Sequence, residues 1–258
     1  MPELILTFGD EDRPGRIVPD LPRDEDAVLE LLRVAEFTAS KLIPWGSNYS
    51  FAAALATADG RELLAIYKPR SGEAPLYDFP DGTLYLRETA AYHLSRRLGW
   101  NLVPPTVVRD GPHGIGSVQL YVEPMPDDGD PRRFWGACTE EIERLVLFDH
   151  VANNADRKLS HCLRDRAGKV WGIDHGLTFN EYPKLRTVLW QFVGQPISTS
   201  LLDCLQALRD DEQNVREELG VFLSRAELNA LFSRVDRLIA SKRYPVLNPH
   251  RNIPYGWW

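Results

Sequence analysis

The chain has 258 residues, of which 43% are apolar and 26% charged, and its formal net charge is −7 at pH 7. These proportions are typical of a soluble globular protein that buries one large core or two modest ones. The acidic balance argues against a binder of duplex nucleic acid, which needs clustered Lys and Arg, and no stretch approaches the roughly 20 apolar residues of a membrane span. The three cysteines lie far apart, without the spacing of a zinc site or a disulfide framework, so we expect reduced thiols in a cytoplasmic protein.

The first predicted elements are a helix and a hairpin. Apolar residues recur at helical spacing over residues 26–41, with charged residues between them, and this pattern predicts an amphipathic helix. An apolar run over 51–55 and a second run up to Lys68 follow, and the Asp59-Gly60 pair between them is typical of a tight turn. We therefore expect an antiparallel hairpin whose second strand carries Lys68 near its end.

A second helix and two more strands complete the first half of the chain. Helical periodicity returns over residues 84–99 and ends on Gly99, the residue type that a helix C-cap favours, which puts Glu88 in the first turns. The runs 103–108 and 116–122 then predict two strands joined by a Gly-rich turn. The first half is thus predicted to be a small, mainly antiparallel sheet with a helix inserted.

The clearest break in composition lies at residues 124–133, which are rich in Pro, Asp and Gly. We place the boundary between two lobes there, with residues 1–123 in the first and 124–258 in the second. The second lobe is predicted to be mostly helical, with helices over 139–152, 199–220 and 225–242 and a short hairpin over 162–173. The predicted class is α+β, with a small β lobe and a mostly helical lobe.

Two acidic motifs in the second half indicate phosphoryl-transfer chemistry. Asp156 lies in the polar stretch 153–161, and Asp174 stands before a His-Gly pair at the end of the predicted hairpin. Kinases place a catalytic acid and a metal ligand in this order, with a short hairpin between them. Lys68 and Glu88 alone are weak evidence of a functional site, because strand-end lysines and helical glutamates are usually solvated. Together with the two acidic motifs they become candidates for the same site.

The two motifs resemble those of the phosphatidylinositol 3/4-kinase-like family. This family has a two-lobed protein-kinase-like fold and includes type II phosphatidylinositol 4-kinases and, more distantly, HipA-type toxin kinases. The resemblance rests on Asp156-Arg157 with the polar His161 five positions after the acid, and on the sequence Ile-Asp-His-Gly-Leu-Thr-Phe at 173–179. It covers roughly residues 46–196, looks nearest to an uncharacterised actinobacterial family, and implies an ATP-dependent kinase.

The resemblance implies a role for each acid. Asp156 would orient or deprotonate the acceptor hydroxyl, and Asp174 would hold the Mg²⁺ or Mn²⁺ ion that bridges the phosphates of ATP. The family usually has Asn where this chain has His161. Its imidazole would be a second metal ligand, or it would only hydrogen-bond within the loop.

Cations would balance the negative charge of the transferring phosphoryl group. The resemblance implies that Lys68 contacts the phosphates, with Glu88 as its ion-pair partner. Arg157 or Lys158, which follow the catalytic acid directly, would add further positive charge. Many members of the family have His in place of Lys158.

The resemblance also assigns residues to the nucleotide. The position of the phosphate-covering loop is occupied here by Gly46, Ser47, Asn48 and Ser50. The strand that leads into the lobe linker would bind adenine through Gln119, Tyr121, Val122 and Glu123. An ordinary turn and a plain core strand fit the same sequences.

Two other functions remain open on the sequence alone. One is a catalytically weak nucleotide-binding or regulatory protein with the same fold. The other is a metal-dependent phosphohydrolase, because three histidines stand near acids in the sequence: His150, His161 and His175. The phosphoryl acceptor stays undetermined among protein, lipid and small molecule, because kinases of all three kinds share the nucleotide machinery.

Overall fold

The computed structural model describes residues 24–255 apart from 45, 59, 61, 126–133 and 138. The chain divides into two compact units, the first formed by Met1–Tyr85 and Pro105–Tyr121 and the second by Leu86–Pro104 and Val122–Trp258. Residues 86–104, which the sequence reading put in the first lobe, group with the second unit. The division into lobes 1–123 and 124–258 stays a prediction.

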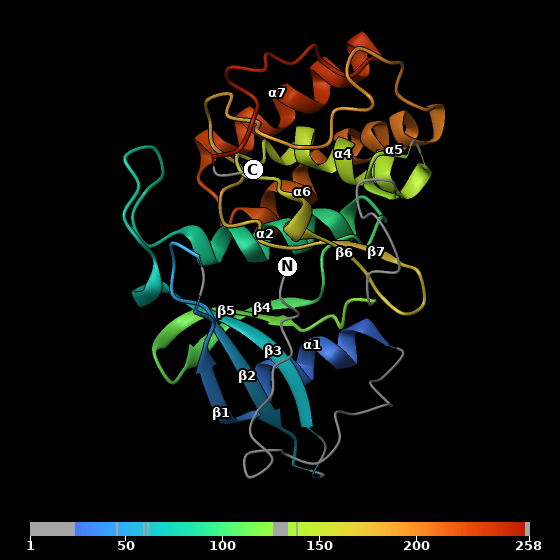
Figure 1. The fold of residues 1–258 in the computed structure, drawn as a ribbon. Helices are drawn as coiled ribbons and strands as arrows, with labels where there is room; N and C mark the ends of the chain where they lie inside the picture. Colours follow the sequence, from blue (N-terminus) through green and yellow to red (C-terminus); the bar gives the residue numbers. More distant parts are fainter. Residues whose placement is uncertain are drawn as a thin grey trace. The chain divides into compact units, whose positions relative to one another are not determined.

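The first unit holds one antiparallel sheet (Figure 1). Its strands are β1 (Glu36–Leu42), β2 (Phe51–Ala56), β3 (Glu62–Pro69), β4 (Thr106–Gly111) and β5 (Gly114–Leu120). They lie in the order β1-β2-β3-β5-β4, and all neighbours are antiparallel. The predicted hairpin of β2 and β3 and the predicted strands β4 and β5 are confirmed, although Asp59 of the predicted turn lies outside the described residues.

Only the first part of the helix predicted over 26–41 is helical. Helix α1 covers Glu25–Val34, and its N-terminus is capped by the carboxylate of Asp24. From Glu36 onwards the chain pairs with β2 as strand β1. The prediction was therefore wrong for residues 36–41.

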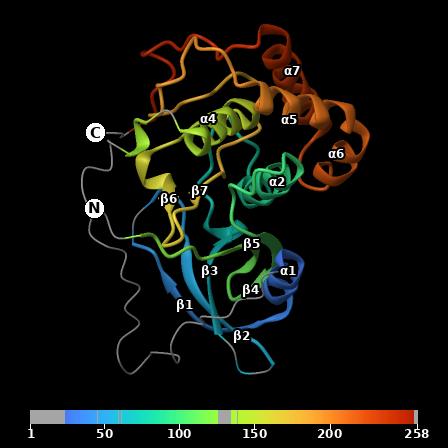
Figure 2. The same cartoon turned by 90° about the vertical axis from the view of Figure 1, so that its right-hand side faces the viewer.

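The end of α1 is set by Arg109 on β4, which α1 packs beside (Figure 2). The Nη1 atom of Arg109 donates to the carbonyl oxygens of Leu32 (2.9 Å) and Ala35 (2.7 Å). A helix leaves its last carbonyls without internal donors, so this guanidinium satisfies the C-terminus where it stands. The contact comes from a residue far along the chain, which explains why local periodicity overextended the helix.

The second unit is mostly helical (Figure 1). It holds α2 (Leu84–Arg97) from Leu86 on, α4 (Glu140–Ala152), α5 (Thr199–Asp210), α6 (Glu212–Leu219), α7 (Arg225–Ser241) and the hairpin of β6 (Cys162–Arg164) and β7 (Val170–Gly172). The predicted Gly cap of α2 is confirmed, because Gly99 has a φ of +69°. Where the sequence predicts one helix over 199–220 the structure has two, since Asp211 leaves helical geometry (φ −93°, ψ 19°). Within the described residues, no helix combines the length and the apolar character that crossing a bilayer requires.

Helix α4 lies in the core of the second unit. All residues from Leu145 to Ala152 are buried, so the last two turns of α4 are covered on every side. Apolar side chains of α7, among them Leu231 and Val235, are buried in the same unit, and the two helices pack together. The loop that follows α4 therefore starts from a rigid base.

Candidate active site

The loop after α4 is shaped by two asparagines. Asn153 ends the helix in the left-handed conformation (φ 54°), which Asn adopts more readily than most residues. Asn154 donates from Nδ2 to Oδ1 of Asp149 (2.9 Å), and its own Oδ1 accepts the backbone N–H of Asp156 (2.9 Å). These side chains take the place of helical backbone bonds and fix the backbone at Asp156.

Arg157 is a buried anchor of the loop. Its guanidinium is fully buried and holds both carboxylate oxygens of Asp149, with Nε–Oδ2 and Nη2–Oδ1 distances of 2.8 Å each. It also donates to the carbonyl oxygens of His161 (2.8 Å) and Ile173 (3.2 Å). Burial by itself would lower the pKa of Arg157, but the charge and hydrogen bonds of Asp149 outweigh it and raise the pKa. Of the two cations expected to face the phosphates, Arg157 is thus engaged inside the protein.

Lys158, the next residue, points to Asp156. Its Nζ lies 2.9 Å from Oδ2 of Asp156, and the two side chains are 31% and 22% exposed, so both remain within reach of a substrate. Burial raises the pKa of Asp156, and the hydrogen bond and charge of Lys158 oppose that rise. The carboxylate is thus partly desolvated and oriented by one cation.

His161 connects the two predicted acids. Its Nδ1 lies 2.9 Å from the carbonyl oxygen of Asp156, which can only accept, so Nδ1 carries the proton. Its Nε2 lies 3.2 Å from Oδ2 of Asp174. Burial lowers the pKa of His161, against the opposing charge of Asp174. A neutral ring therefore presents the lone pair of Nε2 to a carboxylate oxygen, an arrangement that a cation between the two atoms would stabilise.

Asp174 follows β7 in the left-handed conformation (φ 60°), and the next residue is tied to α2. The backbone N–H of His175 donates to Oε2 of Glu88 (2.9 Å), whose side chain is buried. Glu88 thus holds the chain directly after Asp174. The expected ion pair between Glu88 and Lys68 would join residues of different units and stays a prediction.

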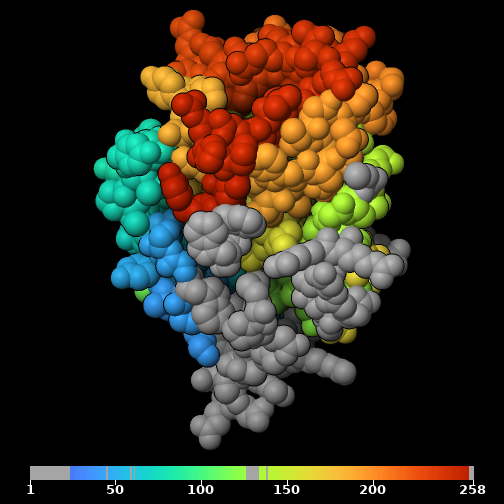
Figure 3. All heavy atoms as spheres, turned by 45° about the horizontal axis from the view of Figure 1, so that its top comes forward, coloured from blue at the N-terminus to red at the C-terminus, as the bar shows by residue number. Residues whose placement is uncertain are grey.

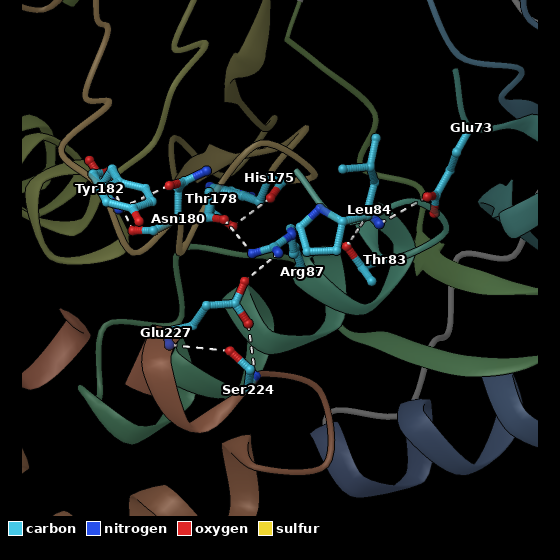
Figure 4. A network of polar contacts seen from close by, with 12 residues as sticks. Glu73, Thr83, Leu84, Arg87, His175, Thr178, Asn180, Tyr182, Ser224 and Glu227 are labelled. Atoms are coloured by element: carbon cyan, nitrogen blue, oxygen red, sulfur yellow. Dashed lines mark hydrogen bonds and ion pairs between the residues drawn. The ribbon is translucent and has the colours of Figure 1, made fainter. Parts of the chain in front are cut away.

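A second set of contacts holds the following turn (Figure 4). The hydroxyl of Thr178 donates to the carbonyl oxygen of His175 (2.6 Å), and the carbonyl of Thr178 accepts from Nη1 of Arg87 (2.8 Å). Arg87 is paired with Glu227, which also forms the capping box of α7 with Ser224. The segment after Asp174 is thereby fixed to both α2 and α7.

In the first unit, the predicted phosphate loop lies in the connection between β1 and β2. Gly46 has a φ of +115°, and Oδ1 of Asn48 accepts the backbone N–H of Ala74 (2.8 Å). Lys68 is half-buried on β3, opposite Ser117 of β5. The assignment of this connection and of Lys68 to the phosphates of a nucleotide stays a prediction.

The predicted adenine strand is β5 and the residues after it. Gln119 is paired on both sides, with β3 and β4, and its side-chain Nε2 donates to Oγ1 of Thr106 (2.9 Å). Tyr121 donates its N–H to the carbonyl of Leu64 (3.0 Å). Glu123 carries an ion pair with Arg166. The assignment of adenine to Gln119, Tyr121, Val122 and Glu123 stays a prediction.

Sequence reasoning missed the partners that hold the site. Asp149 and Asn154 fix the loop, and neither is distinguished by spacing from an ordinary surface residue. The sequence did hold one indication of these partners. Asp149 stands at the buried end of α4, and a charged residue in such a position needs a partner. Across the described residues, no three or more His, Cys, Asp and Glu side chains gather into a group that could hold a metal ion by itself.

Comparison with known proteins extends this description. No protein-family model matches the chain. Its sequence is 39% identical over 267 residues to Protein Rv2133c of Mycobacterium tuberculosis, a match that covers 90% of this chain and 95% of that protein. The chain of Protein Rv2133c and this one are therefore related over nearly their whole lengths.

Solved structures resemble the fold. The Golgi casein kinase with Mn and ADP bound superposes with a TM-score of 0.55 at 14% identity, over 87% of this chain and 80% of that chain. Hydra Fam20 with sugar gives a TM-score of 0.53 at 14% identity, over 86% and 90%. The chain has a kinase-like fold, and the predicted α+β class with an antiparallel β unit and a helical unit is confirmed.

Proposed function

The chain belongs to the family of Protein Rv2133c of Mycobacterium tuberculosis, and we propose that it is an ATP-dependent phosphotransferase that moves the γ-phosphoryl group to a hydroxyl acceptor. The observation that carries the proposal is the placement of Asp156 and Asp174 on the two sides of His161. The kinase-like fold supports it, since kinases hold their catalytic acid and metal ligand on the corresponding loops. We also propose that the chain is a member of the phosphatidylinositol 3/4-kinase-like family.

The donor set suits a divalent ion that arrives with a nucleotide. Oδ2 of Asp174 and Nε2 of His161 lie 3.2 Å apart, and both are acceptors when the imidazole is neutral. Magnesium sites in kinases use one or two carboxylates and complete their coordination with phosphate oxygens and water. We assign Asp174 and His161 as ligands of Mg²⁺ or Mn²⁺, which would neutralise charge on the phosphates. The nitrogen ligand favours Mn²⁺ more than an all-oxygen site would.

Asp156 is assigned to the acceptor. Its carboxylate is partly desolvated and aligned by Lys158, so it is able to orient a hydroxyl and accept its proton as the phosphoryl group transfers. Lys158 is the cation next to this position, whereas Arg157 keeps the loop backbone in place. In this proposal Lys158 acts at the substrate, whereas Arg157 stabilises the loop from inside the protein.

ATP itself would be held mainly by the first unit. We assign Lys68 to the phosphates with Glu88 as its partner. We assign the connection between β1 and β2 to cover them, through Gly46, Ser47, Asn48 and Ser50. Adenine would be bound by the backbone at Tyr121, Val122 and Glu123, directly after β5.

The phosphohydrolase alternative loses two of its three histidines. His150 lies in α4, is buried against Tyr244, and its pKa is lowered to about 4 by burial. His175 is buried, with Nε2 lying 2.8 Å from Nη2 of Arg157. Neither ring is placed with His161 to form a metal centre made of protein ligands.

Two substitutions and one matched control test the proposal. Binding of Mg·ATP and Mn·ATP to the full chain is measured by calorimetry, and transfer of labelled γ-phosphate to a heat-treated bacterial lysate is measured separately. Asp174→Asn should weaken metal-dependent nucleotide binding about tenfold or more, because an amide does not compensate a divalent ion. Asp156→Asn should keep nucleotide binding but lose about a hundredfold or more of transfer. Asp203→Asn, the same change on the exposed face of α5, should alter neither.

The outcomes separate the candidate functions. Nucleotide binding without any transfer by the parent protein would indicate a regulatory protein with a degenerate site. Failure of the parent protein to bind ATP with either metal, or full binding by Asp174→Asn, would refute the assignment of the metal site.

A further inference from the structure

Two segments without any acid lie side by side in the second unit. Residues 182–202 contain two cations and residues 237–258 contain four, and neither stretch has an Asp or Glu, although the chain carries a net charge of −7. The backbone N–H of Ile197 donates to the carbonyl of Lys242 (3.0 Å), and that of Tyr244 donates to the carbonyl of Gln195 (2.9 Å). The segments are thus joined along their length.

A second set of contacts joins their other ends. The backbone N–H of Thr187 donates to the carbonyl of Asn252 (2.9 Å), and Nδ2 of Asn252 donates to the carbonyl of Leu185 (2.6 Å). The guanidinium of Arg186 stacks on the ring of Tyr255 at 4.8 Å. Figure 3 shows the C-terminal stretch, in red, at the surface beside orange segments of the same unit.

We name these two adjoining segments together the basic surface and define it by their cations: Lys184, Arg186, Arg237, Lys242, Arg243 and Arg251. The four cations of the C-terminal segment are all exposed, whereas Lys184 and Arg186 are half-buried. Within the part of the chain that the structure describes, no ion pair joins Arg237, Lys242 or Arg251 to a carboxylate. Cations on adjoining segments that contain no acid produce a local positive potential on an otherwise acidic protein.

Two carboxylates close to the second segment have partners of their own. Asp236 precedes the second segment and is paired with Arg209 of α5 (2.6 Å). Glu143 accepts the backbone N–H of Ser198 (3.1 Å) and the hydroxyl of Tyr244 (3.3 Å), so it helps to fix the two segments from beneath. Arg209 therefore balances the charge of Asp236, whereas Glu143 keeps its charge beneath the segments and offsets only part of the positive charge of the surface.

The basic surface begins next to the loop after α4, which carries Asp156. The backbone N–H of Arg157 donates to the carbonyl of Arg186 (3.0 Å), and the N–H of Val188 donates to the carbonyl of Arg157 (3.1 Å). Asp156 and Lys158 flank this point of contact in the sequence. A chain bound along the basic surface would therefore reach the residue that we assign to the acceptor hydroxyl.

We propose that the basic surface docks an acidic polypeptide and that Ser or Thr of this polypeptide is the phosphoryl acceptor. The inference rests on the proposed function. Exposed cations complement Asp and Glu side chains, and three exposed apolar side chains supply the contacts that protein interfaces use: Tyr182, Val246 and Tyr255, at 67%, 84% and 76% exposure. The side chain of Asp156 is only 22% exposed, so the acceptor must come on a segment narrow enough to enter, as an extended peptide does and a planar bilayer surface does not.

The test uses a fluorescein-labelled peptide with one central Ser between runs of Glu, and the same peptide with Gln in place of Glu. Binding to the full chain is followed by fluorescence anisotropy, and transfer from Mn·ATP is followed with labelled γ-phosphate. The variant R237E/K242E/R251E reverses three exposed cations of the basic surface, and R33E/R144E/R225E reverses three cations outside the two segments, on α1, on α4 and at the far end of α7. Thermal unfolding of both variants, and a neutral R237Q/K242Q/R251Q variant, guard against loss of folding.

We expect the surface variant to bind the Glu peptide about tenfold more weakly than the parent protein, since exposed pairs contribute a few tenths to one kcal/mol each. The KM for the peptide should rise with little change in kcat, while Mn·ATP affinity stays the same. Added salt should weaken the parent protein's binding, and the Gln peptide should bind poorly throughout.

Three other outcomes would contradict the docking surface, the polypeptide partner or the role of this partner as acceptor. Equal peptide binding by the two triple variants would overturn the docking surface. Binding to phosphatidylserine vesicles is measured for the same variants. If R237E/K242E/R251E lost vesicle binding but kept peptide binding, the docking surface would be overturned in favour of a membrane surface. Surface-dependent peptide binding together with absent ATP binding would leave the docking surface standing, overturn the acceptor role, and refute the proposed function.

Discussion

Breaking the ion pair of Asp149 and Arg157 should destabilise the second unit severely. Both side chains are buried, at 1% and 0% exposure, and two bonds of 2.8 Å join them. Asp149→Leu leaves a guanidinium in the core without its counter-charge, and Arg157→Met leaves a carboxylate. Removing one partner of such a pair costs about 3–5 kcal/mol, because the remaining charge stays desolvated.

The double variant D149L/R157M separates charge from packing. The carbonyls of His161 and Ile173 lose their donor in the Arg157→Met variant and in the double variant alike, so their cost cancels in the coupling energy. The double variant should therefore be more stable than the sum of the single effects by about 2 kcal/mol or more.

Urea unfolding followed by tryptophan fluorescence measures this coupling. Four of the seven tryptophans belong to described positions of the second unit: Trp100, Trp135, Trp171 and Trp190. Asp203→Leu, at an exposed position of α5, is the matched control and should stay within about 0.5 kcal/mol of the parent protein. Additive single effects, with no coupling, would refute the view that the pair holds the loop by mutual charge compensation.

Three further predictions concern single residues of the second unit. Burial lowers the pKa of His150 to about 4, below its unfolded value near 6.5, so its stabilising neutral state is complete above pH 6.5 and is lost as the pH falls towards 4. Unfolding at a series of pH values should show about 3 kcal/mol of this loss, and His150→Gln should flatten the profile. Ser224→Ala removes half of the capping box with Glu227 and should cost about 1 kcal/mol in urea unfolding, an effect that Ser224→Asp should largely restore. At Gly172 an added Cβ would lie 2.9 Å from Cδ1 of the buried Leu145, so Gly172→Ala should cost about 1–3 kcal/mol, and an unchanged melting temperature would contradict that close packing.

Local signals predicted the elements that depend on neighbours in sequence. The hairpin of β2 and β3 followed from two apolar runs with a turn between them, and the end of α2 followed from Gly99. Asp156 and Asp174 were proposed as site residues for the same reason, because each stands in a short motif, and their roles stay predictions. The contact of His161 with both acids is an outcome of the fold, although its sequence position raised it as a candidate.

Contacts between distant residues decided the parts that the sequence did not predict. Arg109 ends α1 from β4, and without that contact nothing in residues 26–41 marks the change from helix to strand. Asp211 divides the helix predicted over 199–220, and its carboxylate lies 3.0 Å from Arg97 of α2. In each case a side chain elsewhere in the fold satisfies groups that the local pattern leaves undetermined.

The same reasoning explains how two adjacent cations come to differ. Arg157 and Lys158 carry the same charge, but they differ in their partners and in the shape of the charged group. Asp149 lies on the last buried turn of α4, and the planar guanidinium of arginine meets both of its oxygens at once, which a lysine ammonium does not. Lys158 instead pairs with Asp156, and both of these side chains are partly exposed. The fold of the loop and the environment of the Asp156 carboxylate should therefore respond to separate substitutions, since the first depends on the buried pair of Asp149 and Arg157 and the second on the partly exposed pair of Asp156 and Lys158.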